Sequence, residues 1–172
     1  MVEEIYDPLV HLIRNAIDHG IEDPEEREKK GKDKKGMIKL RAYHKGGNIV
    51  IEVSDDGRGL NIEKIRKKAI EVGLISEEEE LSEQEIYNLI FQPGFSTAEH
   101  VTEVSGRGVG MDVVKNVVEK FRGKIEVTSI KDKGTTFSII LPLTLGIIDG
   151  IIVKVLNERF IIPAILVKEV LK

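Results

Sequence analysis

Polar side chains that could do chemistry gather near the N-terminus, between residues 11 and 19. A spacing of four residues separates His11 from Asn15 and Asn15 from His19, which places all three on one face of a helix. Arg14 and Asp18, also four residues apart, fall on the same side. A solvated face with an Arg14–Asp18 ion pair is the simplest interpretation. However, asparagine has poor helix propensity and its amide oxygen suits a hard cation, so cation binding is the alternative.

Three further motifs combine glycine with polar residues. Asp55-Asp56-Gly57-Arg58-Gly59 follows a predicted strand, and taken alone such a run is typical of a turn. The glycine-rich segment 105–112, Ser-Gly-Arg-Gly-Val-Gly-Met-Asp, precedes a predicted helix, where its backbone N–H groups could approach an anion. It differs from both the P-loop and the dinucleotide-binding fingerprints. Gly134-Thr135 predicts a hairpin turn.

Hydrophobic periodicity predicts the elements that must position these motifs. Asp7 and Pro8 resemble an N-cap and first helical residue, and Gly20 a C-terminus, so we expect a helix over about 8–19. Its buried stripe is Leu9, Leu12, Ile13, Ala16 and Ile17. Residues 22–36 carry a run of charges without an apolar period. They predict a solvated excursion with a short helical start at Pro24.

The rest of the chain alternates between strand and helix patterns. Apolar–polar alternation predicts hairpins over 38–53 and 124–141, and a further pair of strands over 151–162. Helical periods are present over 62–72, after the Ser82–Glu85 capping box, and over 113–121. Residues 91–110 have no period, and a connection of this length is typical of a functional loop. We therefore expect an α+β fold: a two-layer α/β sandwich with a mixed sheet covered by helices on one face, plus a C-terminal β fragment.

Composition excludes several classes of protein. The 172 residues are 41% hydrophobic and 33% charged, which is a globular composition. The net charge of -4 disfavours a nucleic-acid partner, and without cysteine there is no disulfide or thiolate metal site. The chain has neither an 18-residue apolar run nor a basic, apolar leader. We expect a cytoplasmic protein that does not insert into a membrane.

The order of the four motifs resembles the Bergerat ATP-binding fold of the GHKL superfamily, which includes gyrase, Hsp90, histidine kinases and MutL. Details within the segments 11–20, 55–59, 91–97 and 105–112 are similar to the chemotaxis histidine kinase (CheA) family. The resemblance covers residues 5–145 and implies a domain over 1–145. Residues 141–145 resemble the junction with a CheW-like regulatory domain, so 146–172 would be the incomplete start of that β domain.

The resemblance also implies roles for individual residues. Asp55 would accept a hydrogen bond from the adenine amine, while Gly57 and Gly59 would pass under the base and Thr135 would hold the adenine side. Asn15 would ligate Mg²⁺, and His11 could polarise the acceptor histidine. Further contacts to ATP would come from Arg14, Asp18, His19, Lys64, Lys68, Ser105, Gly106, Gly108, Gly110 and Met111, with residues 95–109 acting as the ATP lid.

The implied activity is that of an ATP-dependent protein-histidine kinase in two-component chemotaxis signalling, a transferase in a phosphorelay. Its acceptor would be a histidine on a separate phosphotransfer domain, because none of the four histidines lies in a four-helix phosphotransfer pattern. Full-length relatives would also engage a CheW-like coupling protein and chemoreceptors. The alternative is a nucleotide-gated interaction module that binds ATP without transfer. An ordinary sensor kinase is disfavoured because His11 and His19 flank Asn15.

Overall fold

The computed structural model describes residues 2–95, 110–143, 150–155, 158–163 and 167. The chain divides into two compact units, Met1–Pro142 and Leu143–Lys172. The predicted domain boundary after residue 145 falls within 144–149, outside the described residues. No helix in the described part of the chain is long and apolar enough to cross a membrane.

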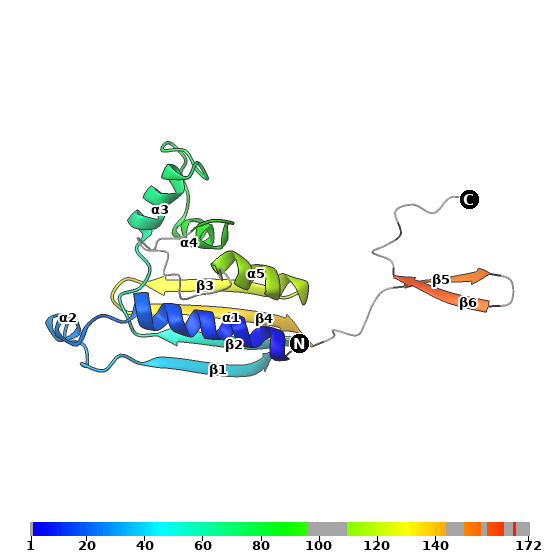
Figure 1. Cartoon of the computed structure of the whole chain (residues 1–172), viewed down its shortest axis with the longest axis horizontal. Coiled ribbons are helices and arrows are strands. Elements are labelled where there is room, and N and C mark those ends of the chain that lie inside the picture. The colour runs from blue at the N-terminus through cyan, green and yellow to red at the C-terminus, as the bar shows by residue number, and fades with distance from the viewer. Residues whose placement is uncertain (1, 96–109, 144–149, 156–157, 164–166, 168–172) are drawn as a thin grey trace. The chain divides into compact units, whose positions relative to one another are not determined.

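A four-stranded sheet forms one layer of the first unit (Figure 1). It consists of β1 (Ile38–Lys45), β2 (Asn48–Asp55), β3 (Lys124–Ile130) and β4 (Gly134–Pro142), in the order β1-β2-β4-β3. The two predicted hairpins and the α+β sandwich are confirmed. The expected mixed pairing is wrong, because every described strand pair is antiparallel. β2 and β3 do run in the same direction, but β4 lies between them and pairs with both.

Helices form the second layer. The helical elements of the unit are α1 (Val2–Asn15), the π-helical turn Ala16–Gly20, α2 (Pro24–Lys29), α3 (Ile62–Glu71), α4 (Glu83–Asn88), the 3₁₀ turn Leu89–Phe91 and α5 (Met111–Lys120). Of these, α2 lies beyond the end of the sheet (Figure 1). Figure 1 shows α1 lying along β2 and β4, with α5 beside it next to β3. The predicted capping box of α4 is present, since the Ser82 hydroxyl accepts from Glu85 N and the Glu85 carboxylate accepts from Ser82 N.

One hydrophobic core joins the two layers. Leu12 of α1, Val114 and Val118 of α5 and Ile139 of β4 are each no more than 1% exposed. Phe91 and Phe137 meet edge to face, with ring centroids 6.4 Å apart. This core fixes the helix layer on the sheet, and so fixes both α1 and the C-terminal end of β2, which carry the predicted site residues.

The first helix differs from its prediction at both ends. It begins at Val2 rather than near Pro8, because Ile5 is buried in the core and extends the apolar stripe one turn earlier. Burial of Ile5 offsets the cost of a proline inside the helix. At the other end the backbone widens into a π turn, with Ile21 N donating to Ala16 O at 2.8 Å. This changes the rotation per residue, so Ile17, expected to be buried, is 57% exposed.

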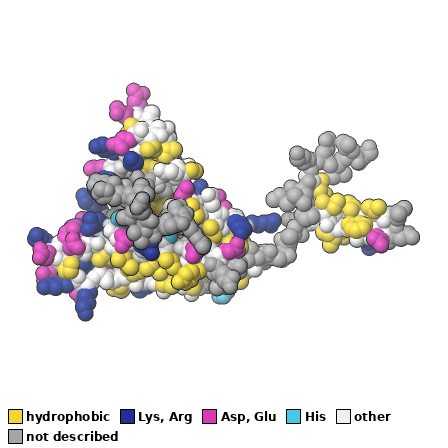
Figure 2. Space-filling view, viewed as in Figure 1, with side chains coloured by type: hydrophobic (Ala, Val, Ile, Leu, Met, Phe, Trp, Pro, Cys, Tyr) yellow, Lys and Arg dark blue, Asp and Glu magenta, His cyan; other side chains and the backbone are white. Residues whose placement is uncertain are grey.

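The second unit contains a β-hairpin, β5 (Gly150–Val155) and β6 (Glu158–Pro163), paired antiparallel. It matches the strands predicted over 151–162. Figure 2 shows hydrophobic atoms gathered over this hairpin.

Candidate functional site

Asp55, at the end of β2, is a half-buried carboxylate held by two backbone groups. Its Oδ1 accepts hydrogen bonds from Gly57 N at 2.9 Å and from Thr135 N at 3.3 Å. Burial raises the pKa of Asp55, and these two backbone hydrogen bonds oppose the rise. Because both bonds use Oδ1, the other carboxylate oxygen can accept a hydrogen bond from a ligand.

The turn after Asp55 packs against the end of the π turn. Arg58 N donates to Gly20 O at 2.8 Å, and a Cβ atom on Gly57 would lie only 2.0 Å from the same oxygen. A side chain at residue 57 would therefore push this turn away from the π turn. Gly134 is equally constrained, because its φ is +114° and a Cβ atom would lie 1.9 Å from Asp55 O. Both glycines are required by close approach of the backbone.

Thr135 lies beside Asp55 and is 5% exposed. Its hydroxyl shares a hydrogen bond of 3.1 Å with that of Ser129, which also accepts from Leu60 N at 2.8 Å and donates to Gly134 O at 3.2 Å. Ser129 thus links the segment after Gly59 to the β3–β4 turn. No sequence pattern indicated Ser129, because a serine in a strand carries no motif of its own.

The second group of predicted residues lies where α1 meets the N-terminus of α5. The Asn15 amide nitrogen donates to the Met111 thioether sulfur at 3.3 Å. Burial lowers the pKa of His11, the positive charge of Arg14 lowers it further and Asp112 opposes the fall. His11 is therefore neutral at pH 7 and lies within the electrostatic reach of α5. Gly110 is the N-cap of α5, so the helix end that attracts anions lies beside Asn15.

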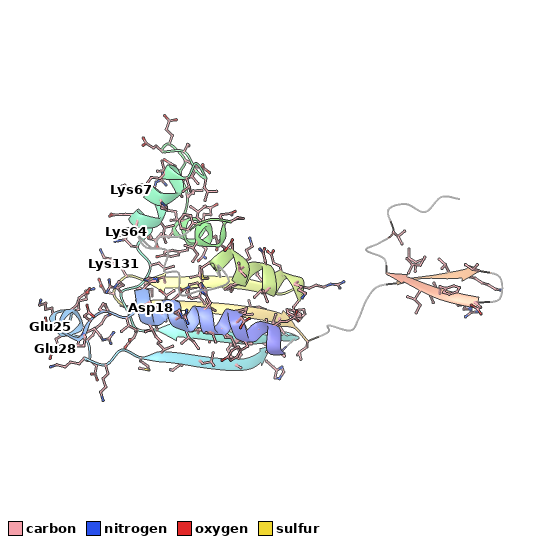
Figure 3. All side chains as sticks on the ribbon, viewed as in Figure 1. Asp18, Glu25, Glu28, Lys64, Lys67 and Lys131 are labelled. Atoms are coloured by element: carbon pink, nitrogen blue, oxygen red, sulfur yellow. The ribbon has the colours of Figure 1, made fainter. Side chains whose placement is uncertain are left out.

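The other predicted contact side chains that the structure describes are exposed or partly exposed. Asp18 and His19 are exposed on the π turn, and Lys64 is exposed on the first turn of α3 (Figure 3). Lys68 pairs with Glu71 at 3.7 Å on the surface of α3. Ser105, Gly106, Gly108 and most of the predicted lid lie outside the described residues.

A divalent cation would find few protein ligands at this site. Among the described residues no group of three or more His, Cys, Asp or Glu side chains could hold a metal ion. Asn15 offers one neutral oxygen, since its amide nitrogen is engaged with Met111. Such a donor set fits Mg²⁺ that is held mainly by the phosphates of a nucleotide, the usual situation for this ion.

The predicted solvated excursion over 22–36 is wrong at two residues, Glu22 and Arg27, and most of the others are exposed as predicted. The short helix from Pro24 is present, but Glu22 and Arg27 are only 2% and 1% exposed. The Arg27 guanidinium binds the Asp56 carboxylate, with Nη1–Oδ1 and Nη2–Oδ2 distances of 3.1 and 2.9 Å. Opposite charges that meet across the fold can be buried without an apolar period. The pattern of charges along the sequence did not indicate this pairing.

Known proteins are similar to this chain in sequence and in fold. The family model described as "Histidine kinase-, DNA gyrase B-, and HSP90-like ATPase" matches residues 4–145. The chain is 54% identical over 165 residues to Chemotaxis protein CheA of Bacillus subtilis, covering 95% of this chain and 25% of that protein. It is 55% identical over 172 residues to Chemotaxis protein CheA of Klebsiella aerogenes, covering 100% of this chain and 26% of that protein.

The Sensor histidine kinase CheAY of Helicobacter pylori is 54% identical over 165 residues, covering 95% of this chain and 20% of that protein. The chain thus spans about a quarter or less of the length of these relatives. Among solved structures, the catalytic domain of histidine kinase ThkA is 19% identical with a TM-score of 0.50, covering 83% of this chain and 68% of that chain. This likeness concerns the fold.

Proposed function

Because the chain belongs to the histidine kinase-, DNA gyrase B- and HSP90-like ATPase family, we propose that it is the catalytic domain of a chemotaxis histidine kinase. It binds ATP and transfers the γ-phosphoryl group to a histidine on a separate phosphotransfer domain. Identities of 54% and 55% to chemotaxis proteins support this proposal. The observation that carries it is Asp55, a half-buried carboxylate fixed by the backbone of Gly57 and Thr135.

Adenine recognition follows from the geometry of Asp55. The exocyclic amine of adenine donates to the free carboxylate oxygen, whereas guanine carries a carbonyl at that position and would repel it. Thr135 holds the adenine side through its hydroxyl, which Ser129 orients at 3.1 Å. Gly57 and Gly59 keep this part of the site free of side chains.

Phosphate binding falls to the region between α1 and α5. The N-terminus of α5, with Gly110 and Met111, meets the triphosphate, together with Gly106, Gly108 and Ser105 of the preceding loop. Arg14, Lys64 and Lys68 add positive charge, and His19 and Asp18 add polar contacts. Mg²⁺, with Asn15 as its protein ligand, supplies charge neutralisation at the phosphates.

The transfer step depends on the protonation state of His11. An imidazole nitrogen of the acceptor histidine attacks the γ-phosphorus, the bond to the bridging oxygen breaks, and ADP leaves with the electron pair. Because its pKa is lowered by burial and by Arg14, His11 is neutral and accepts a hydrogen bond from the other ring N–H of the acceptor. This contact makes the attacking nitrogen more electron-rich.

The proposal extends to partners and location. Residues 146–172, which lie within the second unit, would be the start of a CheW-like β domain, through which the whole protein would engage a coupling protein and chemoreceptors. We place the reaction in the cytoplasm, where ATP is available.

Phosphotransfer to an added domain tests the proposal. The chain is incubated with γ-labelled ATP, Mg²⁺ and a phosphotransfer domain, and the label is expected on the added domain as an acid-labile phosphohistidine. The chain alone acquires no label. If ATP binds but no label is transferred, the protein is instead a nucleotide-gated interaction module, and if ATP does not bind, the proposal is wrong.

A further inference from the structure

A cluster of four charged side chains includes and contacts the turn that follows Asp55. This Arg27 cluster consists of Glu22, Arg27, Lys32 and Asp56. The Glu22 and Arg27 side chains are 0% and 1% exposed, and Arg27 Nη1 binds Glu22 Oε2 at 3.2 Å. Figure 2 shows positive and negative side chains intermixed at the end of the molecule that carries α2.

Lys32 uses its ammonium group to hold the backbone of the turn. Its Nζ donates to Asp56 O at 2.9 Å, to Gly57 O at 2.7 Å and to Glu22 Oε1 at 2.8 Å. These three acceptors use all three donors of the group. The two carbonyls belong to the residues that immediately follow Asp55 in the chain.

Arg27 holds the same turn through the Asp56 side chain. Its fork binds both Asp56 carboxylate oxygens, and Asp56 Oδ1 also accepts from Met37 N at 2.9 Å. On its other side, Arg27 donates to Asp33 O at 2.6 Å. The turn is therefore fixed between the 22–36 segment and the first residue before β1.

The position of Gly57 determines the orientation of the Asp55 carboxylate, because Gly57 N is the closer of its two donors. Lys30 links Glu22 to the β3–β4 turn, because its Nζ lies 3.4 Å from Glu22 Oε1 and 2.7 Å from Asp132 Oδ1. That turn leads to Thr135, the second donor to Asp55. Both backbone groups that orient Asp55 are thus tied, through Lys32 and Lys30, to the buried carboxylate of Glu22.

A buried ion cluster is a poor source of stability, because desolvation of the charges offsets most of their attraction. The cluster instead fixes the positions of the backbone groups that it binds. We propose that the Arg27 cluster positions the Asp55–Gly57 turn for adenine, so that Lys32 and Arg27 set the preference for ATP over GTP without contacting nucleotide. This inference rests on the proposed function, since it assigns adenine to Asp55.

The variant Lys32→Met tests the inference, with Lys34→Met as its matched control. Lys34 lies two residues away, is 64% exposed and pairs with exposed Glu28 of α2 at 3.1 Å. Dissociation constants are measured by calorimetry for Mg·ATP, Mg·GTP and Mg·tripolyphosphate, and folding is followed by thermal unfolding. Lys32→Met is expected to weaken ATP about tenfold, the effect of one misplaced hydrogen bond to a charged group. The dissociation constants of Lys32→Met for GTP and tripolyphosphate are unchanged, as are all three dissociation constants of the Lys34→Met control.

The outcomes separate positioning from simple structural damage. An equal loss for all three ligands, or unchanged ATP affinity in folded Lys32→Met, overturns the inference. Should that variant not fold, Lys30→Met replaces it, because Lys30 is 31% exposed and its loss breaks only the link to Glu22, Glu26 and Asp132. The same selective loss of ATP is expected there. Wild-type protein that fails to bind ATP contradicts the proposed function itself, whereas wild-type binding with unaffected variants contradicts the inference alone.

Discussion

Asp55 has the two properties that a carboxylate needs to read a base: partial burial, which strengthens its hydrogen bonds, and a fixed orientation. Burial alone would raise its pKa and favour the protonated acid. The backbone N–H groups of Gly57 and Thr135 offset part of that rise without adding a cation that would compete with the ligand. The Asp55 carboxylate is therefore a directional acceptor for one neutral N–H donor of a ligand.

Asp55→Asn is expected to weaken ATP binding by about 10- to 100-fold, because a hydrogen bond to a charged group contributes about 1.5–3 kcal/mol. The fold is retained, since the asparagine oxygen can still accept from Gly57 N and Thr135 N. Calorimetry gives the dissociation constant, and thermal unfolding serves as the control. An unaltered dissociation constant would remove Asp55 from the binding site.

Asn15→Ala is expected to abolish the Mg²⁺ dependence of ATP affinity and to suppress transfer, while adenosine binding stays nearly intact. The reason is that the amide oxygen meets only the metal, and the adenine side lies at the end of β2. Titrations of ATP with and without Mg²⁺, and of adenosine, separate these effects. Asn48→Ala, at the first residue of β2 and at the opposite end of that strand from Asp55, is the control. A parallel loss of adenosine binding would make Asn15 structural.

The 22–36 segment holds the turn after Asp55 in place through charged side chains. It contains only six residues of regular helix, α2, and it is held by charges where the other helices are held by apolar packing. Burial works to raise the pKa of Glu22, but hydrogen bonds and charge from Lys32 and Lys30 outweigh it and lower the pKa to about 2. The stability that this segment contributes therefore depends on pH in acid.

The lowered pKa of Glu22 determines how the unfolding free energy changes with pH. Glu22 has an ordinary pKa of 4.5, so its contribution to stability is complete above pH 4.5 and is lost as the pH falls toward about 2. Glu22→Gln is expected to lower the unfolding free energy by about 1–3 kcal/mol at pH 7 and to flatten its decline below pH 4.5. Denaturant unfolding between pH 2.5 and 7 measures both, with exposed Glu28→Gln as the control. An unchanged pH profile in Glu22→Gln would contradict this assignment.

At the scale of the whole molecule, the two units differ in how completely they bury apolar surface. The first has a core with both layers represented, whereas β5 and β6 form a two-stranded hairpin. Ile152 and Ile161 are 67% and 71% exposed, and Val155 and Phe160 are about half exposed. Two strands alone are marginally stable in water, and an exposed apolar edge favours association.

We therefore expect the 172-residue chain to self-associate through residues 147–163. A shorter chain ending near Leu145 is expected to be monomeric and still to bind ATP, because Met1–Pro142 forms its own compact unit. Sedimentation of both chains at tens of micromolar, together with ATP titration, checks this. A monomeric long chain would contradict the association, and loss of ATP binding in the short one would place the tail within the catalytic fold.

Much of this protein follows from local patterns in the sequence. Alternation of period two predicted both hairpins of the sheet, and the Ser82–Glu85 spacing predicted the start of α4. The arrangement of Asp55 at the end of a strand and Asn15 on a helix was also predictable. These features depend on residues two to four positions apart, whose geometry the backbone determines wherever the segment lies.

Tertiary structure alone decided the rest. The sequence did not indicate that β4 would separate β2 from β3, that α1 would end in a π turn, or that Arg27 would be buried against Asp56, 29 residues away. The second donor to Asp55, Thr135, lies 80 residues from it. Contacts of this kind depend on how the helix layer packs on the sheet, and a charged side chain is buried or solvated according to the partner that packing brings to it.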